Sequence, residues 1–182
     1  MKEFIEEERQ LLNVKRMSSE YLIRGYDLAQ HSYFVASMFI EFCERESITI
    51  SSKEIQLVMR HDIIETMTGD LLYPAKNRNE KTQMAWEVIE DAVVFERPEF
   101  KKYSDKSIKN NLSKEKWDVF KACDLLELAL FCKEEIILGN SSDGLKEVYN
   151  NCQRLLKELT NNLSSVKKFI KNSIIPYESI RK

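Results

Sequence analysis

The sequence has few of the residues that make tight turns: its 182 residues include only four glycines and three prolines. All-β sandwiches and barrels depend on many such turns, so the composition disfavours them. Neither GxGxxG nor GxxxxGKS/T occurs, which argues against the glycine-rich loops that bind phosphate. Basic residues number 28 and acidic residues 30, for a net charge of −2. Because the chain lacks the basic excess of a general nucleic-acid binder, we expect no stable nucleic-acid binding.

Long apolar runs are also missing. No stretch of about 18 apolar residues is present, so no membrane span is predicted, and the charged N-terminus contains no apolar signal core. None of the four cysteines forms a CxxC pair or a zinc-finger spacing. We therefore expect buried free thiols and a cytoplasmic protein. Histidine is scarce as well, and any site that needs imidazole has only His31 and His61.

What is present predicts an all-α protein. Apolar residues make up 43% of the chain and recur at helical spacing, which predicts a single domain over residues 1–182 with about six or seven helices. Asp27 and Ser113 are suitable N-caps, and Gly69 and Gly139 are suitable helix ends. The expected elements are helices over about 2–15, 27–46, 51–68, 79–96, 113–139 and 142–172, and an exposed polar loop over 99–112.

Several polar side chains stand at positions that a passive apolar core would not choose. His61, Asp62 and Glu65 fall close together in the expected third helix, with Glu65 four residues after His61. Asp124 lies on an apolar stripe of the fifth helix, where an unpaired carboxylate would cost several kcal/mol. His31 raises the same question in the second helix.

Two interpretations of these side chains stay open on the residues alone. A lone histidine on an apolar helix face is more often a hydrogen-bonded core residue than a ligand, and a lone aspartate in a helix is more often a surface or capping group. Two histidines, two aspartates and a glutamate on three helices could nevertheless converge on one divalent cation. Mixed imidazole and carboxylate donors suit Mn, Fe, Co, Ni or Zn better than Ca.

The middle of the chain resembles a known family. Residues 61–70 read HDIIETMTGD, followed by Pro74 and Lys76. This string resembles the HD-domain phosphohydrolases, and most of all the YfbR-type 5′-deoxynucleotidases, whose stretch reads HDxxE…TGD…P.K. Residues outside this string also match the family pattern. His31-Ser32 matches the upstream histidine motif, Asp124 matches the downstream aspartate, and Arg16 matches an arginine before the first histidine. The resemblance covers about residues 10–140.

The resemblance implies four ligands for one divalent metal ion: His31, His61, Asp62 and Asp124. The identity of the ion stays open among Mn, Co, Fe, Ni, Zn and Mg. Such a cation polarises a phosphoryl group and lowers the pKa of a bound water, so that a nucleophile forms near neutral pH.

The resemblance also implies roles around the metal ion. Glu65 would orient the attacking water or pass a proton. Asp70 would accept a hydrogen bond from a sugar hydroxyl or brace its own loop. Arg16 would pair with phosphate oxygens through its planar guanidinium, Lys76 is a second phosphate ligand, and Met17 is a further substrate contact.

Two positions depart from the family pattern. Gln30 replaces a glutamate before the first ligand histidine, and Met17 replaces a tryptophan that is linked to packing on the deoxyribose. Selectivity between deoxyribose and ribose therefore stays open. The resemblance implies a homo-oligomer, a dimer or higher, while the last 40 or so residues predict an amphipathic helix that packs on the core or on another subunit.

Three functions stay open in the sequence. The first is removal of the 5′-phosphate from (deoxy)nucleoside monophosphates. The second uses the same metal ligands to release triphosphate from a dNTP. A triphosphate needs more cations around the pocket than a monophosphate, and the candidates are few: Arg16, Arg24, Lys76 and Arg78. This second function is therefore mildly disfavoured. The third is a catalytically silent HD protein that binds a nucleotide, but none of the family's ligands is lost here.

Overall fold

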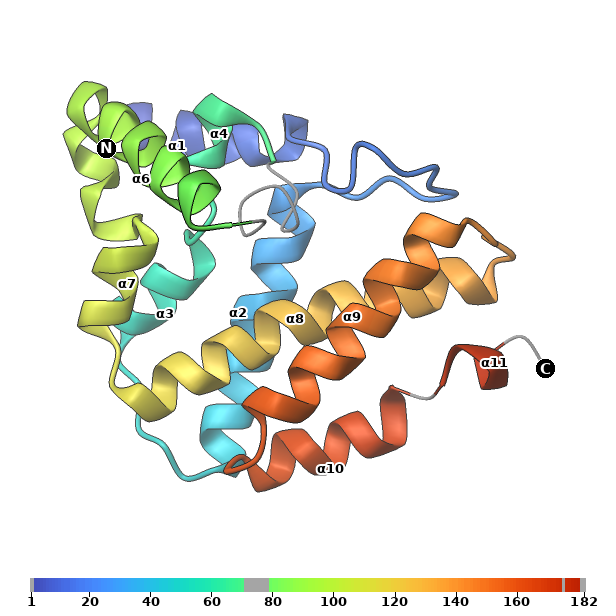
Figure 1. Ribbon diagram of the computed structural model, residues 1–182. Helices are drawn as coiled ribbons and strands as arrows, with labels where there is room; N and C mark the ends of the chain where they lie inside the picture. Colours follow the sequence, from blue (N-terminus) through green and yellow to red (C-terminus); the bar gives the residue numbers. More distant parts are fainter. Residues whose placement is uncertain (1, 71–78, 175, 181–182) are drawn as a thin grey trace.

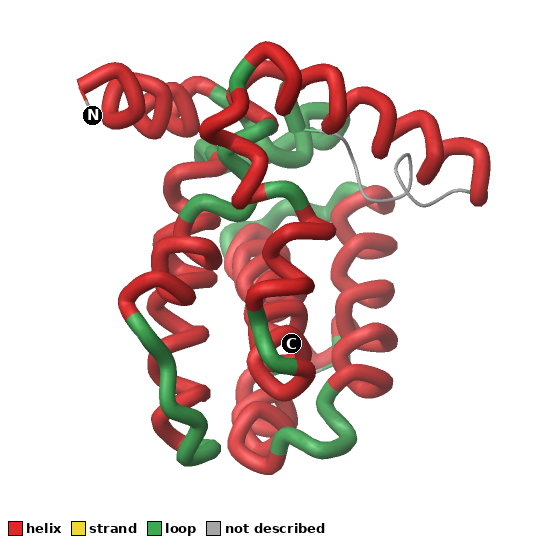
Figure 2. The backbone as a smooth tube through the Cα atoms, turned by 90° about the vertical axis from the view of Figure 1, so that its left-hand side faces the viewer, coloured by secondary structure: helices red, strands yellow, loops and turns green. Residues whose placement is uncertain are grey.

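The computed structural model describes residues 2–70, 79–174 and 176–180 of the chain. Within these ranges the backbone consists of helices and connecting loops, with no strand (Figure 2). One isolated antiparallel bridge joins Lys15 to Asp27 and closes the loop between the first helical segment and the second. The predicted all-α fold is confirmed.

Three long helices form the centre of the molecule. Helix α8 (Lys114–Ile137) packs against both α2 (Leu28–Arg45) and α9 (Asp143–Leu159), as Figure 1 shows. The predicted N-caps are confirmed, because the side chain of Asp27 accepts from Gln30 N–H and that of Ser113 from Lys116 N–H. The interior of this layer is apolar, with Val35, Phe39, Cys43, Phe120, Cys123, Leu126, Cys132, Leu145, Tyr149 and Leu156 almost fully buried.

A second, smaller core lies at the N-terminal end of the fold. It joins α1 (Lys2–Gln10) and the 3₁₀ turn η1 (Leu11–Asn13) to the segment after α3 (Ser52–Met59). Arg60 crosses between them, donating to Glu8 at 2.7 Å and to the Tyr103 hydroxyl at 2.9 Å. These contacts hold the residues after Arg60 in place against α1.

The predicted helix over 51–68 is wrong in its middle. Helix α3 ends at Met59, residues 60–64 form turns, and a short α4 (Glu65–Thr68) follows before Gly69 at φ 76°. The interruption coincides with Arg60 turning toward Glu8 and with the contact of His61 Nδ1 to the Val58 carbonyl oxygen. His61 and Asp62 therefore lie in a turn and not within a helix.

The predicted exposed loop over 99–112 is also wrong. This segment contains a 3₁₀ helix η2 (Pro98–Tyr103) and α7 (Asp105–Asn111), which Ser104 caps by accepting from Ser107 N–H. Its lysines, serines and asparagines cover the outside, while four apolar residues at near-helical spacing point inward and are buried: Phe100, Tyr103, Ile108 and Leu112.

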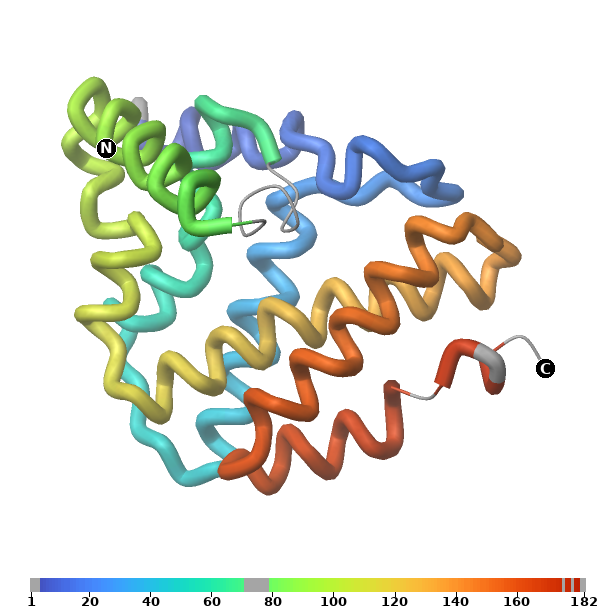
Figure 3. The backbone as a smooth tube through the Cα atoms, viewed as in Figure 1, coloured from blue at the N-terminus to red at the C-terminus, as the bar shows by residue number. Residues whose placement is uncertain are grey.

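The last predicted helix, 142–172, is divided in two. Helix α9 ends at Leu159, and α10 (Ser164–Ser173) runs back along α8 and α2 before the short α11 (Tyr177–Ile180), a reversal that Figure 3 shows. Leu163 is buried at the turn. Glu46, at the end of α2, accepts from Ser165 N–H at 2.6 Å and so caps α10 from a distant part of the chain.

Helix α6 (Glu80–Glu96) follows the predicted boundaries and begins with a capping box of Asn79 and Thr82. One side of it is apolar and solvent-exposed: Met84 is 60% exposed, Val88 68% and Phe95 88%. Among the described residues no helix combines the length and the apolar character that a membrane span requires.

Candidate metal centre

Three segments that are far apart in the sequence supply the predicted ligands. His31 lies in the second turn of α2, His61 and Asp62 lie in the turn between α3 and α4, and Asp124 lies in the middle of α8. Helix α2 packs against both α3 and α8 (Figure 1), which brings the segments that carry these side chains close together. His31 is fully buried and the side chain of His61 is 5% exposed.

The side-chain atoms of this cluster converge. One ligand atom from each of His31, His61 and Asp62 lies within 4.8 Å of the other two. His31 Nε2 is 3.3 Å from His61 Nε2 and 3.7 Å from Asp62 Oδ2, which is itself 3.3 Å from His61 Nε2. Asp124 joins the cluster through His31, with its Oδ1 at 3.2 Å from His31 Nε2.

These separations fit the ligand shell of a transition metal. Two ligand atoms that each lie about 2.1 Å from one cation and at right angles stand about 3.0 Å apart. The described separations run from 3.2 to 3.7 Å. Two imidazole nitrogens with two carboxylates form the mixed donor set that Mn, Fe, Co, Ni and Zn accept. The residues therefore fit the divalent ion that the sequence predicts.

Both imidazoles turn the same nitrogen toward the cluster. Nε2 faces the other ligands in each case, while Nδ1 meets an acceptor outside: Glu127 Oε2 at 2.5 Å from His31, and the Val58 carbonyl oxygen at 2.7 Å from His61. A nitrogen that donates to such an acceptor carries the ring proton, which leaves the Nε2 lone pair free for a metal ion.

The charged groups of the cluster shift one another's pKa values. Burial raises the pKa of Asp62 and of Asp124, yet the histidines, Arg16 and Lys121 outweigh burial and hold both pKa values below the usual range. Burial likewise lowers the pKa of His61, but the adjacent Asp62 carboxylate raises it above its ordinary value. Both aspartates are therefore ionised at neutral pH and can act as ligands.

Arg16, a predicted phosphate-binding residue, lies beside this cluster. Its Nη1 donates to Asp62 Oδ2 at 3.0 Å, and its side chain is 13% exposed. Burial opposes the charge, but Tyr26, Asp62 and Asp124 together raise the pKa of Arg16. A positive charge therefore lies next to an oxygen of Asp62, a predicted ligand.

Met17 and Asp70 meet each other. The Met17 N–H donates to Asp70 Oδ2 at 3.1 Å, and Met17 has a positive φ of 51°. Its side chain is only 4% exposed and belongs to the larger apolar core. Asp70 thus braces the strained backbone that follows Arg16, which is one of the two roles considered for it.

Glu65 begins α4 three residues after Asp62 and is 4% exposed. Its N–H donates to the Asp62 carbonyl oxygen at 2.9 Å, so the two residues share one turn. Lys76, the other predicted phosphate ligand, lies outside the described residues, as do Pro74 and Arg78.

Three residues near the cluster were not predicted. Glu127 Oε2 receives hydrogen bonds from His31 and from the Tyr26 hydroxyl, and Lys121 Nζ donates to Asp124 Oδ2 at 2.6 Å. The available signal was their spacing, since Lys121 and Glu127 lie three residues before and after Asp124 on the same face of a helix. The position of Tyr26 in a loop gave no such signal.

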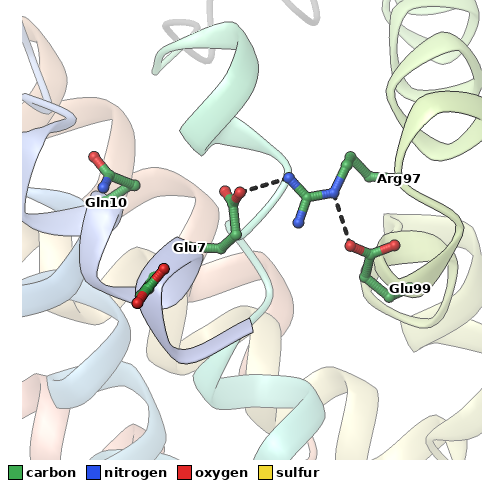
Figure 4. Close-up of a pocket in the computed structure, with 5 residues that line it drawn as sticks. Glu7, Gln10, Arg97 and Glu99 are labelled. Carbon is green, nitrogen blue, oxygen red and sulfur yellow. Dashed lines mark hydrogen bonds and ion pairs between the residues drawn. The ribbon is translucent and has the colours of Figure 1, made fainter. Parts of the chain in front are cut away.

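A surface hollow of about 340 Å³ lies elsewhere, between α1 and the start of η2. Arg97 donates there to Glu7 at 2.5 Å and to Glu99 at 2.7 Å, and Gln10 completes the rim (Figure 4). Its lining is acidic, its one arginine is already paired, and it shares no residue with the histidine–aspartate cluster. We assign it no function.

A family model described as 5′-deoxynucleotidase YfbR-like matches residues 3–177. No curated protein matches the chain.

Solved structures show the same fold. An HD-domain phosphohydrolase from Listeria innocua has a TM-score of 0.78 and 20% identity over 93% of this chain and 85% of its own. The HD phosphohydrolase DatZ of cyanophage S-2L, bound to dA and one catalytic Zn²⁺, has a TM-score of 0.66 and 17% identity over 92% and 96%. A conserved hypothetical protein from Pyrococcus furiosus has a TM-score of 0.70 and 21% identity over 100% and 99%.

Proposed function

This chain belongs to the YfbR-like 5′-deoxynucleotidase family, and we propose that it removes the 5′-phosphate from deoxynucleoside monophosphates. The family supports a metal-dependent phosphohydrolase, and the observation that carries the proposal is the convergence of His31, His61 and Asp62 within 4.8 Å of one another, with Asp124 beside His31. A deoxynucleoside substrate is compatible with DatZ, a structural neighbour that binds dA.

Each residue of the cluster has a distinct task in this reaction. His31, His61, Asp62 and Asp124 would hold the cation, which when bound polarises the phosphoryl group and lowers the pKa of water. Glu65 is the acid–base group, because both histidines face the cluster through Nε2 and neither is left to transfer a proton. Its carboxylate orients the attacking water or accepts a proton from that water.

Arg16 is the phosphate-binding residue of this proposal. Its buried guanidinium already contacts a ligand carboxylate, and a planar guanidinium can form paired hydrogen bonds with phosphate oxygens. Lys121 adds a second positive charge on the opposite side of Asp124. Lys76 stays a predicted phosphate ligand, and Asp70 acts by bracing Met17 and, with it, Arg16.

The small number of cationic side chains available to bind phosphate favours a monophosphate substrate over a triphosphate. Arg24, one of the four candidates, pairs with Glu134 at 2.7 Å and lies 3.5 Å from Glu135, at the far end of α8. A triphosphate needs several cations along its length. The predicted homo-oligomer and cytoplasmic location stay predictions.

The decisive experiment separates the products. Purified protein is incubated with dNMPs, NMPs and dNTPs in the presence of Mn²⁺, Co²⁺, Mg²⁺ or Zn²⁺, and orthophosphate and triphosphate are measured separately. We expect orthophosphate from dNMPs and no triphosphate. Triphosphate from a dNTP without monophosphatase activity would overturn the proposal in favour of a triphosphohydrolase.

Asp62→Ala tests whether the cluster carries the activity. We expect this variant to lose both bound metal and turnover. Asp118→Asn, which removes a carboxylate from the same helix as Asp124 but outside the cluster, is the matched control. If no substrate is hydrolysed and Asp62→Ala binds metal like the wild type, a silent nucleotide-binding protein is the better description.

A further inference from the structure

The two imidazoles of the cluster differ in what meets their outer nitrogen. His61 Nδ1 lies 2.7 Å from a neutral backbone carbonyl, whereas His31 Nδ1 lies 2.5 Å from the Glu127 carboxylate. A carboxylate without a proton can only accept, so the hydrogen bond requires the proton on Nδ1 of His31. The Nε2 atom of His31 faces Asp62, Asp124 and His61, where a cation would be bound.

Glu127 is itself held in a fixed position. Its residue is 6% exposed, and the Tyr26 hydroxyl donates to the same Oε2 that meets His31. Tyr26 is 2% exposed and stacks on Phe131 with ring centroids 3.8 Å apart and planes 9° from parallel. Burial, the hydrogen bond from Tyr26 and the stacking of its ring hold the Glu127 carboxylate against His31, so this contact is preorganised.

We propose that Glu127 is a positioning residue of the metal centre. It holds His31 as the Nδ1–H tautomer, fixes the plane of the imidazole and makes Nε2 a more basic ligand for a divalent cation. The inference rests on the proposed function, since it concerns the metal ion of the same reaction. No bond is made or broken in this role, and Glu127 does not touch the substrate.

The same helix offers a matched control. Glu135 is also buried on α8, but its carboxylate accepts from the backbone N–H groups of Ile23 and Arg24 and from the Asn140 side chain, with no contact to the cluster. Replacing Glu135 therefore removes a buried carboxylate of similar burial without touching the metal centre. A purely structural role for Glu127 predicts that the two positions behave alike.

The experiment relies on the presence of only two histidines in the sequence. Tag-free full-length protein labelled with ¹⁵N-histidine has two imidazoles, so its ¹⁵N spectrum reports the tautomers of His31 and His61 directly. We compare the wild type with Glu127→Ala, Glu127→Gln and Glu135→Gln, and measure the dissociation constants for Zn²⁺ and Mn²⁺ on the same samples.

We expect two Nδ1–H imidazoles in the wild type and in Glu135→Gln. In Glu127→Ala one imidazole should leave the Nδ1–H state, and the metal dissociation constant should rise ~10- to 100-fold. In Glu127→Gln the amide oxygen still accepts from Nδ1, so the tautomer should persist while the loss of charge weakens metal binding at least severalfold.

The proposal is wrong if Glu127→Ala keeps both the tautomers and the metal affinity of the wild type, or if Glu135→Gln weakens metal binding equally. Should Glu127→Ala fail to fold, an unchanged metal affinity in Glu127→Gln overturns it as well. None of these readouts uses a nucleotide. A protein that fails to release phosphate but shows these shifts would defeat the proposed function and leave the role of Glu127 standing.

Discussion

Carboxylates buried near the middle of α8 and near its C-terminal end are compensated in opposite ways. In the C-terminal half, the Glu135 carboxylate is fully buried and meets two backbone N–H groups at 2.7 and 3.0 Å and the Asn140 amide at 3.0 Å. Arg24 adds a positive charge 3.5 Å away. These donors outweigh burial and lower the pKa of Glu135, so its charge is satisfied within the chain.

Near the middle of α8, Asp124 and Glu127 share their surroundings with Asp62. Burial raises the pKa of Glu127, but His31 and the Tyr26 hydroxyl outweigh it and hold the pKa below its ordinary value. Three carboxylates thus crowd around two imidazoles, with Arg16 and Lys121 at the edge.

The comparison distinguishes Glu135, a buried carboxylate that stabilises the fold, from the carboxylates that are buried in the candidate metal centre. Backbone amides and an asparagine satisfy one carboxylate completely, which stabilises a loop and offers nothing to a ligand. A cluster in which carboxylates outnumber the neighbouring arginine and lysine retains an excess of negative charge, and a divalent cation relieves it. The following experiments test this difference.

The largest expected effect is at the metal cluster itself. His31→Ala removes the proposed ligand that contacts the other three, so the rate of the proposed phosphatase reaction should fall by a factor on the order of 10³ or more. Bound Mn²⁺ or Zn²⁺ should disappear in metal analysis. Added metal should raise the melting temperature of the wild type but not of the variant, because only a folded site binds the ion. Metal content equal to that of the wild type would contradict the assignment.

Glu65→Gln should separate chemistry from metal binding. The amide cannot accept the proton of the attacking water, so kcat should fall by about 10²- to 10⁴-fold. Metal content should stay that of the wild type, since Glu65 is not a predicted ligand. If KM rises and kcat is unchanged, Glu65 binds substrate and the acid–base assignment is wrong.

Glu135→Ala should produce the reverse pattern. The N–H groups of Ile23 and Arg24 and the Asn140 amide lose their acceptor, so the free energy of unfolding should fall by about 1–3 kcal/mol in denaturant titration. Metal affinity and kcat of the folded protein should match the wild type. A loss of metal affinity would show that the C-terminal end of α8 is coupled to the cluster near its middle.

The smallest effect concerns pH. Because the folded-state pKa of Glu135 lies below its ordinary value of 4.5, its stabilisation is present above that value and is lost as the pH falls through the folded pKa. Unfolding free energies measured between about pH 5 and pH 3 should therefore decrease less in Glu135→Gln than in the wild type. Parallel curves would show that Glu135 keeps its ordinary pKa.

Much of the helical framework was predictable. Asp27 and Ser113 cap α2 and α8 as predicted, and Gly69 and Gly139, both with positive φ, follow the ends of α4 and α8. Caps and apolar periodicity act between residues a few positions apart, so a single sequence carries them. The helices over 99–112 were not predicted, because the polar residues of this segment outnumber its four buried apolar residues.

The site was predictable in its residue types but not in its support. His31, His61 and Asp62 come together, Asp124 lies beside His31, and Arg16 contacts Asp62. The contact of Asp70 with the Met17 N–H, and those of Glu127 with His31 and Tyr26, join positions 53, 96 and 101 residues apart. No local pattern reports such pairs.

The sequence by itself therefore determined the helical class, because apolar periodicity and caps act over a few residues, and it offered candidate side chains for a cation site. The tertiary structure decided where the third helix breaks, since Arg60 turns to Glu8 and the next two residues face α2. It also decided which buried carboxylate on α8 serves the fold and which serves the metal centre. That difference depends on the donors that distant segments bring to each position.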